Sequence, residues 1–168
     1  VLGREADTDG LKMWKDMLAD DWTRDYIMEG LVLSTEFKNI CDSYGITAAF
    51  EPTPESQVRS FVKRMYTVVL NRRADAVGLD NWTRQLMNGT VNGAKVADGF
   101  INSQEFANRN LSNEKYVKVL YRAFFNREPD EGGFNVWMNE LAKGTSRREV
   151  MKGFVHSVEF SDLCAAYG

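Results

Sequence analysis

Several acidic residues near the start of the chain are spaced like the ligands of a calcium-binding loop. When Glu5 is counted as position 1, Asp7 and Asp9 fall at positions 3 and 5. Gly10 then falls at position 6 and Asp16 at position 12. In an EF-hand loop, positions 1, 3, 5 and 12 supply oxygen ligands and position 6 is a glycine. The spacing makes Asp7, Asp9 and Asp16 candidate calcium ligands, although Asp16 replaces the longer, bidentate Glu usual at position 12.

The chain contains its own test of this hypothesis, because nearly the same stretch occurs three times. The copies are GREADTDGLKMW (3–14), NRRADAVGLDNW (71–82) and NREPDEGGFNVW (126–137). The residue that corresponds to Asp16 is Arg84 in the second copy and Asn139 in the third. Since an arginine does not bind a calcium ion, we expect no metal and interpret the recurring acids as helix caps.

Four residue types keep their spacing in all three copies and define one repeated turn. The aspartate is placed to cap the next helix, and the arginine ends the helix before it, where its charge suits the dipole and can pair with a carboxylate. The glycine permits a positive φ or a close helix contact. The tryptophan belongs to an apolar stripe, which favours interior packing over ligand stacking. The turn residues are Arg4, Asp7, Gly10, Trp14, Arg72, Asp75, Gly78, Trp82, Arg127, Asp130, Gly133 and Trp137.

Residues suited to nucleophilic catalysis or phosphate binding are scarce. His156 is the only histidine, and Leu33 and Asn102 occupy the corresponding positions of the other copies. No GxSxG motif accompanies it, and NGTVNG lacks the lysine and the spacing of a phosphate-binding loop. Hydrolysis by two carboxylates stays open because acids are plentiful. The recurring acids are already accounted for as caps, so we expect no enzyme activity and no cofactor.

The remaining functional candidates are aromatic residues outside the repeated turn. Trp22 precedes a predicted helix start and has no aromatic counterpart, since Val91 and Thr145 stand at its position in the other copies. Tyr26 and Tyr44 also lie near predicted helix ends. If the chain binds a glycan or a partner through an exposed ring, Trp22 is the first choice. The alternative is a hydrophobic staple, in which Trp22 packs against the helix that it precedes.

Composition excludes two classes of partner. The chain has 168 residues, of which 43% are hydrophobic and 27% charged, and its formal net charge is −3. Without a basic patch or a run of like charges, we expect no nucleic-acid binding. No stretch approaches the roughly 18 consecutive apolar residues of a membrane-spanning helix, so we expect no membrane insertion.

Helices must position the repeated turn, because apolar residues recur at helical spacing and no segment alternates like a strand. A leading helix precedes the arginine, and a second helix carries the tryptophan. The predicted starts of the third helix are Thr23, Asn92 and Ser146, and Ser146 with Glu149 makes a capping box. A short fourth helix starts at Ser34, Ser103 and Ser157, with an acid in its first turn (Glu36, Glu105 and Glu159). The sequence predicts an all-α fold.

The repeats divide the chain into about two and a half copies of three to four helices each. We assign residues 1–45 to a partial repeat 1, 46–56 to a linker, 57–111 to repeat 2 and 112–168 to repeat 3. The opening VLGRE matches VVLNRR in repeat 2, so repeat 1 lacks its leading helix and we expect the chain to be part of a longer protein. Cys41 and Cys164 occupy the same repeat position, and the sequence leaves open whether they pair.

One long pattern in repeat 3 resembles a known bacterial family. LYRAFFNREPDEGGFNVWMNELAKGTSRREVMKGFVHSVEF (120–160) is similar to the domain of unknown function numbered 4214, with its RxPDxxGxxxW and GFxxSxEF motifs. Repeats 1 and 2 match with alanine in place of the proline. The resemblance implies a helical fold related to phycobilisome linker domains. It also implies tandem copies in secreted and cell-surface bacterial proteins, beside carbohydrate-active, adhesive or S-layer modules, and it supplies no catalytic residues.

Together these observations predict a non-catalytic helical repeat module of a secreted or cell-surface bacterial protein. Its expected role is protein docking, spacing or surface attachment. Its expected partners are other domains of the same chain or a surface protein, with polysaccharide as a further candidate. The alternative is a carbohydrate-binding module appended to a carbohydrate-active enzyme or an adhesin, and a small hydrolase ranks third. A flat pair of exposed aromatic rings near Trp22 would favour sugar binding, and an apolar patch would favour protein docking.

Overall fold

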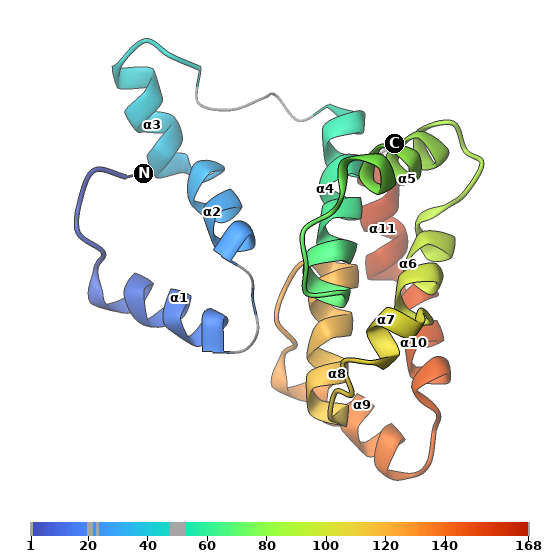
Figure 1. Ribbon diagram of the computed structural model, residues 1–168. Helices are drawn as coiled ribbons and strands as arrows, with labels where there is room; N and C mark the ends of the chain where they lie inside the picture. The colour runs from blue at the N-terminus through green and yellow to red at the C-terminus, as the bar shows by residue number, and fades with distance from the viewer. Residues whose placement is uncertain (1, 20–21, 23, 48–52, 168) are drawn as a thin grey trace. The chain divides into compact units, whose positions relative to one another are not determined.

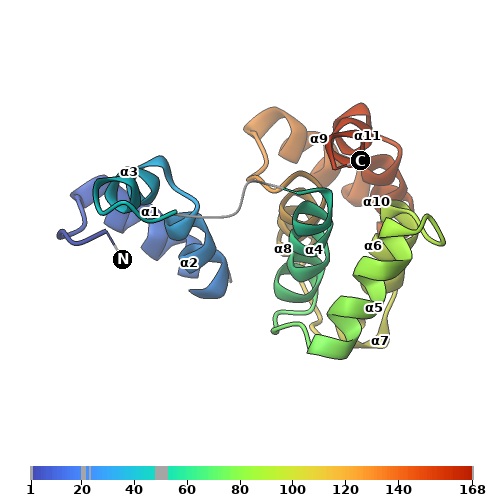
Figure 2. The same ribbon diagram turned by 90° about the horizontal axis from the view of Figure 1, so that it is seen from above.

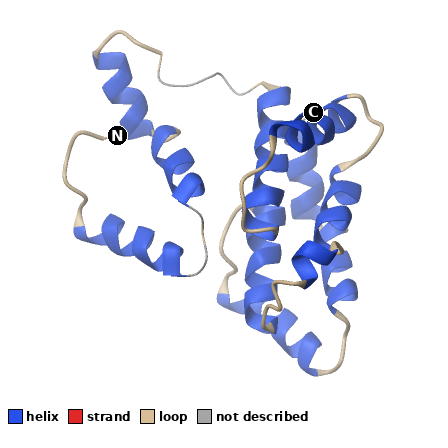
Figure 3. Ribbon diagram, viewed as in Figure 1, coloured by secondary structure: helices blue, strands red, loops and turns tan. Residues whose placement is uncertain are grey.

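The computed structural model describes residues 2–19, 22, 24–47 and 53–167. Within these ranges the regular structure is entirely helical, as Figure 3 shows, and the predicted all-α class is confirmed. The chain divides into two compact units, Val1–Thr53 (unit 1) and Pro54–Gly168 (unit 2). Unit 2 therefore contains both of the predicted repeats 2 and 3, which pack as one body.

The described residues of unit 1 form three helices, which Figure 1 shows in shades of blue: α1 (Thr8–Ala19), α2 (Arg24–Val32) and α3 (Thr35–Ser43). Ser34 caps α3, because its hydroxyl accepts a hydrogen bond from the Phe37 amide at 3.1 Å. Thr23, the predicted start of the third helix of this repeat, lies outside the described residues. No helix of the described residues precedes Arg4.

Unit 2 contains two copies of the full repeat (Figure 1). Repeat 2 comprises α4 (Pro54–Arg64), the π-helical turn η1 (Met65–Val69), α5 (Ala76–Met87), α6 (Gly93–Ile101) and α7 (Gln104–Ala107). Repeat 3 comprises α8 (Asn113–Leu120), η2 (Tyr121–Phe125), α9 (Glu131–Ala142), α10 (Arg147–Val155) and α11 (Val158–Ala166). The helix α4 begins inside the segment predicted as a linker, because a proline with its fixed φ fits the first helical position.

Side-chain caps start most of these helices where the sequence places them. The predicted capping box at the start of α10 is confirmed: the Ser146 hydroxyl accepts from the Glu149 amide, and the Glu149 carboxylate accepts from the Ser146 amide. The other caps with β-region backbone and a side-chain acceptor in unit 2 are Asp75, Asn92, Ser103, Ser112, Asp130 and Ser157. Short polar residues thus fix the helix boundaries.

Each leading helix ends in a π-helical turn, which periodicity did not predict. After η1 the Arg72 amide donates to the Tyr66 carbonyl at 3.2 Å, six residues back. The next turn needs a left-handed residue, and Asn71 and Asn126 supply it with φ values of 53° and 56°. Gly3 holds the same place in unit 1 with φ of 68°. Asparagine and glycine adopt this conformation at the lowest steric cost, so the corner can form in all three copies.

The two leading helices form the centre of unit 2. η1 packs against η2 and α8, and Figure 2 shows α4 beside α8. The largest fully buried side chains include Met65 and Val69 from the first leading helix and Leu120 and Phe124 from the second. The leading helices therefore supply most of the hydrophobic core.

The two repeats of unit 2 contact each other reciprocally. Phe61 of the first leading helix lies 6.2 Å from Phe160 of α11, between ring centroids. The equivalent pair with the repeats exchanged, Tyr116 and Phe106 of α7, lies at 6.0 Å with nearly the same interplanar angle. An interface in which each partner offers the same surface to the other has approximate two-fold symmetry. Unit 2 is therefore a pair of repeats, each completing the core of the other.

Candidate functional site

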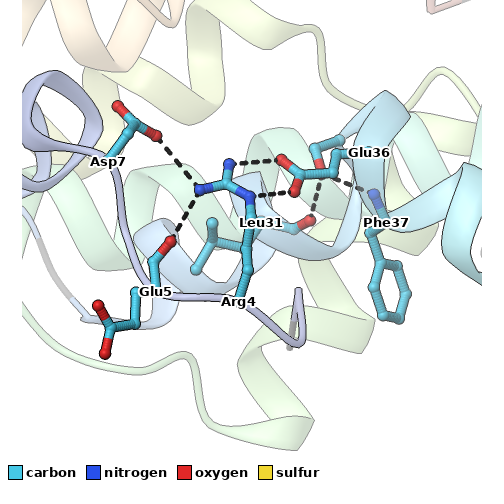
Figure 4. Close-up of polar contacts among 7 residues, drawn as sticks. Arg4, Glu5, Asp7, Leu31, Glu36 and Phe37 are labelled. Carbon is cyan, nitrogen blue, oxygen red and sulfur yellow. Dashed lines mark hydrogen bonds and ion pairs between the residues drawn. The ribbon is translucent and has the colours of Figure 1, made fainter.

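The repeated turn of unit 1 is closed by an arginine that grips a glutamate of the last helix (Figure 4). Arg4 donates through Nε to Glu36 Oε1 at 2.5 Å and through Nη2 to Glu36 Oε2 at 2.9 Å. Its third nitrogen donates to the Glu5 carbonyl at 2.9 Å and lies 3.4 Å from Asp7 Oδ2. We call this two-pronged pair the arginine clamp. It ties the start of the repeat to the first turn of α3.

Unit 2 contains the same clamp twice. Arg72 binds Glu105 at 2.5 and 3.2 Å, and Arg127 binds Glu159 at 2.7 and 2.9 Å. The side chains are about half exposed, so water screens the pairs and each one contributes specificity of geometry more than stability. In all three copies, the guanidinium is bound within the repeat.

The aspartate of the turn caps the second helix in every copy. The carboxylate of Asp130 accepts a hydrogen bond from the Gly133 amide at 2.8 Å, and the Arg127 guanidinium lies 3.5 Å away. The equivalent bonds, both 2.7 Å long, join Asp7 to Gly10 and Asp75 to Gly78. The recurring carboxylates satisfy helix amides that have no partner within the helix.

The glycine of the turn makes room for a tyrosine in unit 2. A Cβ atom built at Gly78 would overlap the Tyr66 hydroxyl, and one built at Gly133 would overlap the Tyr121 hydroxyl. Neither glycine has a positive φ, so the close approach of the phenol accounts for the residue type. The clamp arginines lie over the faces of the same tyrosines, 4.9 Å from the ring centroid in repeat 2 and 5.1 Å in repeat 3.

The tryptophan of the turn lies half-buried against a second recurring glycine. The ring edge of Trp14 would be 3.3 Å from a Cβ built at Gly30, and a Cβ built at Gly153 would overlap Trp137. Trp137 also stacks on Phe154 at 5.1 Å between centroids. The indoles therefore pack between the second and third helices of their own repeats, as their apolar stripe predicts.

The electrostatics of the turn keep its residues in their ordinary charge states at neutral pH. Burial raises the pKa of Tyr66 and Tyr121, and the nearby cap aspartates raise it further. The hydrogen bond from the clamp arginine lowers the pKa of Glu36 and of Glu105. The bond to Glu105 likewise raises the pKa of Arg72. Each shift moves a pKa away from neutrality, the opposite of what a general acid or base needs.

The three candidate calcium ligands, Asp7, Asp9 and Asp16, have different roles in the structure. Asp7 caps α1, and Asp16 accepts a hydrogen bond from Lys12 at 2.7 Å. Asp9 is exposed in the first turn of α1, where an acid suits the helix dipole. Across the described ranges, no group of three or more His, Cys, Asp or Glu side chains could hold a metal ion.

The aromatic candidates of unit 1 do not form a flat exposed platform. Trp22 is only 6% exposed, and its ring lies 4.1 Å from that of Tyr26 at an interplanar angle of 44°. Trp22 thus packs onto the first turn of the helix that it precedes, on the third residue of α2, whereas a hydrophobic staple pairs with the fourth. Tyr44, by contrast, is 78% exposed and ends α3.

A cavity of about 170 Å³ lies between the two repeats of unit 2. Its walls include Phe106 of α7, Tyr116 of α8 and Arg147 of α10. Tyr116 donates to the Arg147 carbonyl at 2.7 Å, and Arg147 Nη2 donates to the Leu111 carbonyl at 2.6 Å. Burial raises the pKa of Tyr116 to about 12. The Tyr116 hydroxyl and the Arg147 guanidinium therefore both bind backbone carbonyls of the protein.

The remaining chemical candidates are single residues. His156 is exposed at the end of α10. Cys41 is buried in unit 1 and Cys164 is half-buried in unit 2, and both are free thiols. Burial raises the pKa of Cys164, which makes it less reactive as a nucleophile at neutral pH.

The sequence predicted the arginines, aspartates and glycines of the turn but not all of their partners. The sequence identifies the clamp glutamates only as first-turn acids and does not distinguish the turn tyrosines from other apolar residues of the leading helix. A signal was present: each glutamate follows its arginine by 32 or 33 residues, and each tyrosine of unit 2 precedes its arginine by six. Recurrence at constant distance from a charged residue identifies such partners.

The fold and the repeated turn define an all-helical tandem-repeat protein. The family model described as Domain of unknown function (DUF4214) matches residues 1–41, 48–110 and 97–164. These segments cover most of the chain, so the chain belongs to this family and the predicted resemblance is confirmed. Searches of curated proteins and of solved structures returned no match. No helix in the described part of the chain is long and apolar enough to cross a membrane.

Proposed function

We propose that this protein is a non-catalytic helical repeat module that acts in protein docking, spacing or surface attachment. The observation that carries the proposal is the internal use of the recurring polar residues. Each clamp arginine binds a glutamate of its own repeat, and each turn aspartate binds a helix amide. A polar residue whose side chain is bound within the fold in all three copies acts in stabilising the fold and not in binding a substrate.

Exposed apolar side chains in unit 1 support docking as the activity. Leu11, Met13, Leu18 and Met28 are all more than 40% exposed on α1 and α2. Leu11 and Leu18 are seven residues apart and therefore lie on the same face of α1, and exposed apolar side chains along one helix face are typical of a surface that another polypeptide covers. Sugar binding has weaker support, because Trp22 is buried.

The family resemblance supports the second part of the proposal, a location outside the cell or on its surface. Brief protease treatment of intact cells that produce the protein tests this part. We expect the protein to be cleaved while a cytoplasmic marker stays intact. Protection of the protein until the cells are lysed would contradict a surface location.

Site-specific crosslinking in the producing cells tests the docking role. A photoreactive residue placed at Leu11 should crosslink to a polypeptide, whereas one placed at Val136, which is exposed on α9 of unit 2, should not. A column of cell-wall or plant polysaccharide should not retain the purified chain. Retention by a polysaccharide, or equal crosslinking at both positions, would contradict the proposal.

A further inference from the structure

The cavity between the two repeats of unit 2 has both charged and apolar walls. Its cationic lining residues, Arg147 and Arg148, lie in the first turn of α10. The apolar part of the lining comes mainly from repeat 2 and consists of Ile101, Phe106, Ala107, Leu111 and Tyr116. Among the described residues that line the cavity there is no Asp or Glu. An anionic group can therefore enter the cavity without meeting a like charge in its walls.

Arg147 is held in place by neutral groups. Its Nη2 donates to the Leu111 carbonyl at 2.6 Å and to Asn113 Oδ1 at 2.8 Å, and its Nε donates to the same amide oxygen at 3.1 Å. The guanidinium also lies over the Tyr116 ring, 4.8 Å from the ring centroid. In the described part of the chain, no carboxylate lies within ion-pair distance of Arg147 or Arg148.

This arrangement differs from that of the clamp arginines, each of which binds a glutamate of its own repeat. Arg147 is half-buried, so its charge is only partly hydrated. Its Nη1 has no acceptor among the described residues, while the other two nitrogens fix the plane of the guanidinium. A positioned nitrogen with an unneutralised charge is suited to donate to an oxygen of a bound anion.

The equivalent place on the other side of unit 2 is closed. Gly93 begins α6 where Arg147 begins α10, and a Cβ built at Gly93 would lie 3.1 Å from Cys164 Sγ and 3.3 Å from the Phe160 ring. Cys164 and Phe160 belong to α11, which has nine residues, whereas its counterpart α7 has four. The cavity is therefore a property of the side on which the last helix is short and an arginine replaces the glycine.

Size and polarity indicate what the cavity can hold. Its volume of about 170 Å³ is close to that of an apolar cavity of about 150 Å³ that binds benzene, so it admits one ring and is too small for a helix. Phe106 and Tyr116, whose ring centroids are 6.0 Å apart, offer surfaces against which a ring can pack.

The neutral polar groups of the lining are already in use. The Tyr116 hydroxyl donates to the Arg147 carbonyl at 2.7 Å, and the Asn102 amide donates to Asp98 at 2.7 Å. A sugar ring would find few partners for its hydroxyl groups here, and a hydroxyl group buried without a partner is costly. An apolar ring needs no such partners.

We propose that this cavity binds a small aromatic carboxylate, with its ring against Phe106 and Tyr116 and its carboxylate on Arg147 Nη1 and the Arg148 side chain. The apolar ring leaves water on binding, and the carboxylate accepts charge-assisted hydrogen bonds. This ligand site goes beyond the proposed docking function and does not depend on it.

Titration of the ¹⁵N-labelled whole chain with benzoate, followed by amide chemical shifts, tests the proposal. We expect saturable shifts at residues 101–107 and 147–148, with a Kd of about 0.1–1 mM, which lies within the limits for so small a ligand. Benzyl alcohol has the same ring without the charge and should bind at least about tenfold more weakly. Galacturonate, a sugar acid, should bind more weakly than benzoate.

Three variants locate the binding. Arg147→Lys keeps the charge but loses the planar guanidinium, and it should weaken benzoate binding at least about tenfold. Arg148→Gln removes a charge from an exposed position, so it should weaken binding about two- to fivefold, and it keeps the test decisive if Arg147→Lys misfolds. Arg84→Gln removes the same charge from an exposed position on α5 outside the lining and should not change the affinity.

Four results would overturn the proposal. The first is the absence of saturable shifts up to about 20 mM benzoate. The second is equal affinity for benzyl alcohol and benzoate, since the arginines would then have no role. The third is a loss with Arg84→Gln as large as that with Arg148→Gln, which would assign the effect to net charge. The fourth is tighter binding of galacturonate than of benzoate at the same amides, which would assign the cavity to a sugar acid.

Discussion

Units 1 and 2 contain the same turn but differ in what covers it. Both have the arginine clamp, the capping aspartate and the half-buried tryptophan, with nearly equal bond lengths. Among the described residues, the leading helices lie in unit 2, and so do the largest fully buried side chains. The comparison separates two tasks: short-range polar contacts shape the corner of each repeat, and a long apolar helix stabilises it.

This separation has a simple energetic reason. The clamp side chains are partly exposed, so each pair contributes little free energy of folding. A fully buried apolar side chain contributes about 1.5–3 kcal/mol, and the leading helices supply several.

The largest effect should come from truncating the core of unit 2. Phe124→Ala removes a fully buried ring that contacts Phe154 and Phe160, so we expect the free energy of unfolding of unit 2 to fall by about 3–5 kcal/mol. Denaturant unfolding monitored by hydrogen exchange measures both units in one experiment. The protection of α1–α3 should not change. A loss below about 1 kcal/mol would mean that the leading helix does not stabilise the repeat.

The turn glycines give the sharpest contrast between the units. Gly133→Ala places a methyl group on the hydroxyl of Tyr121, which is buried and cannot swing aside, so we expect a loss of about 1–3 kcal/mol. A methyl group at Gly10 would lie 3.1 Å from the exposed carboxylate of Asp7, which can shift slightly, so Gly10→Ala should be nearly neutral, because the preference of alanine for the helix offsets the contact. Thermal unfolding of both variants tests the difference.

A second substitution identifies the cause of that loss. Tyr121→Phe removes the hydroxyl that the new methyl group would overlap, so the double variant Tyr121→Phe with Gly133→Ala should recover most of the lost stability. Additive losses in the double-mutant cycle would show that the hydroxyl is not the obstacle.

Removing a clamp should have a small effect. Glu105→Gln leaves the shape of the side chain but removes the charge that Arg72 binds, and we expect a loss of about 0.2–1 kcal/mol in low salt. Because salt screens exposed pairs, the difference between variant and parent should shrink in about 1 M NaCl. Urea midpoints at the two salt concentrations measure it. A loss that is independent of salt would indicate packing rather than charge as the cause.

Acid should weaken both units in the same range of pH. Hydrogen bonds from Arg4 to Glu36 and from the Gly133 amide to Asp130 lower the pKa of these carboxyl groups in the folded chain. Their contribution is therefore present above the ordinary carboxyl pKa of about 4 and is lost as the pH falls through the lower folded values. Circular dichroism and hydrogen exchange between pH 7 and 2 should show loss of helix and weaker protection in both units. Stability that rises as the pH falls below 4 would contradict this assignment.

Much of the fold follows from local sequence patterns. The stripes around Trp82 and Trp137 and the caps at Asn92, Ser146 and Ser157 predict helices because they depend on neighbours within one or two turns. Recurrence of the turn identifies the corner because the same local geometry forms three times. Patterns of this range also account for the confirmed all-α class.

The features that sequence did not predict depend on contacts between distant segments. The pairing of repeats through Phe61 and Phe160 joins residues almost a hundred positions apart, and no local pattern encodes it. The burial of Trp22 is of the same kind, since a large indole before a helix can pack inward or face solvent. The π-helical turns are a third case. They replace the hydrogen bonds of the α-helix with bonds one residue longer, and the pattern of polar and apolar residues does not reveal this change.

The clamp has a practical consequence for engineering. Repeat 2 has one more residue between its arginine and its glutamate than the other repeats have, and the extra residue belongs to the turn between α5 and α6. Despite the extra residue, Arg72 and Glu105 form the same two-pronged pair as Arg127 and Glu159. The connection at 88–92 can therefore lengthen without disturbing the scaffold, and it offers a graft point for a foreign epitope or an enzyme tag.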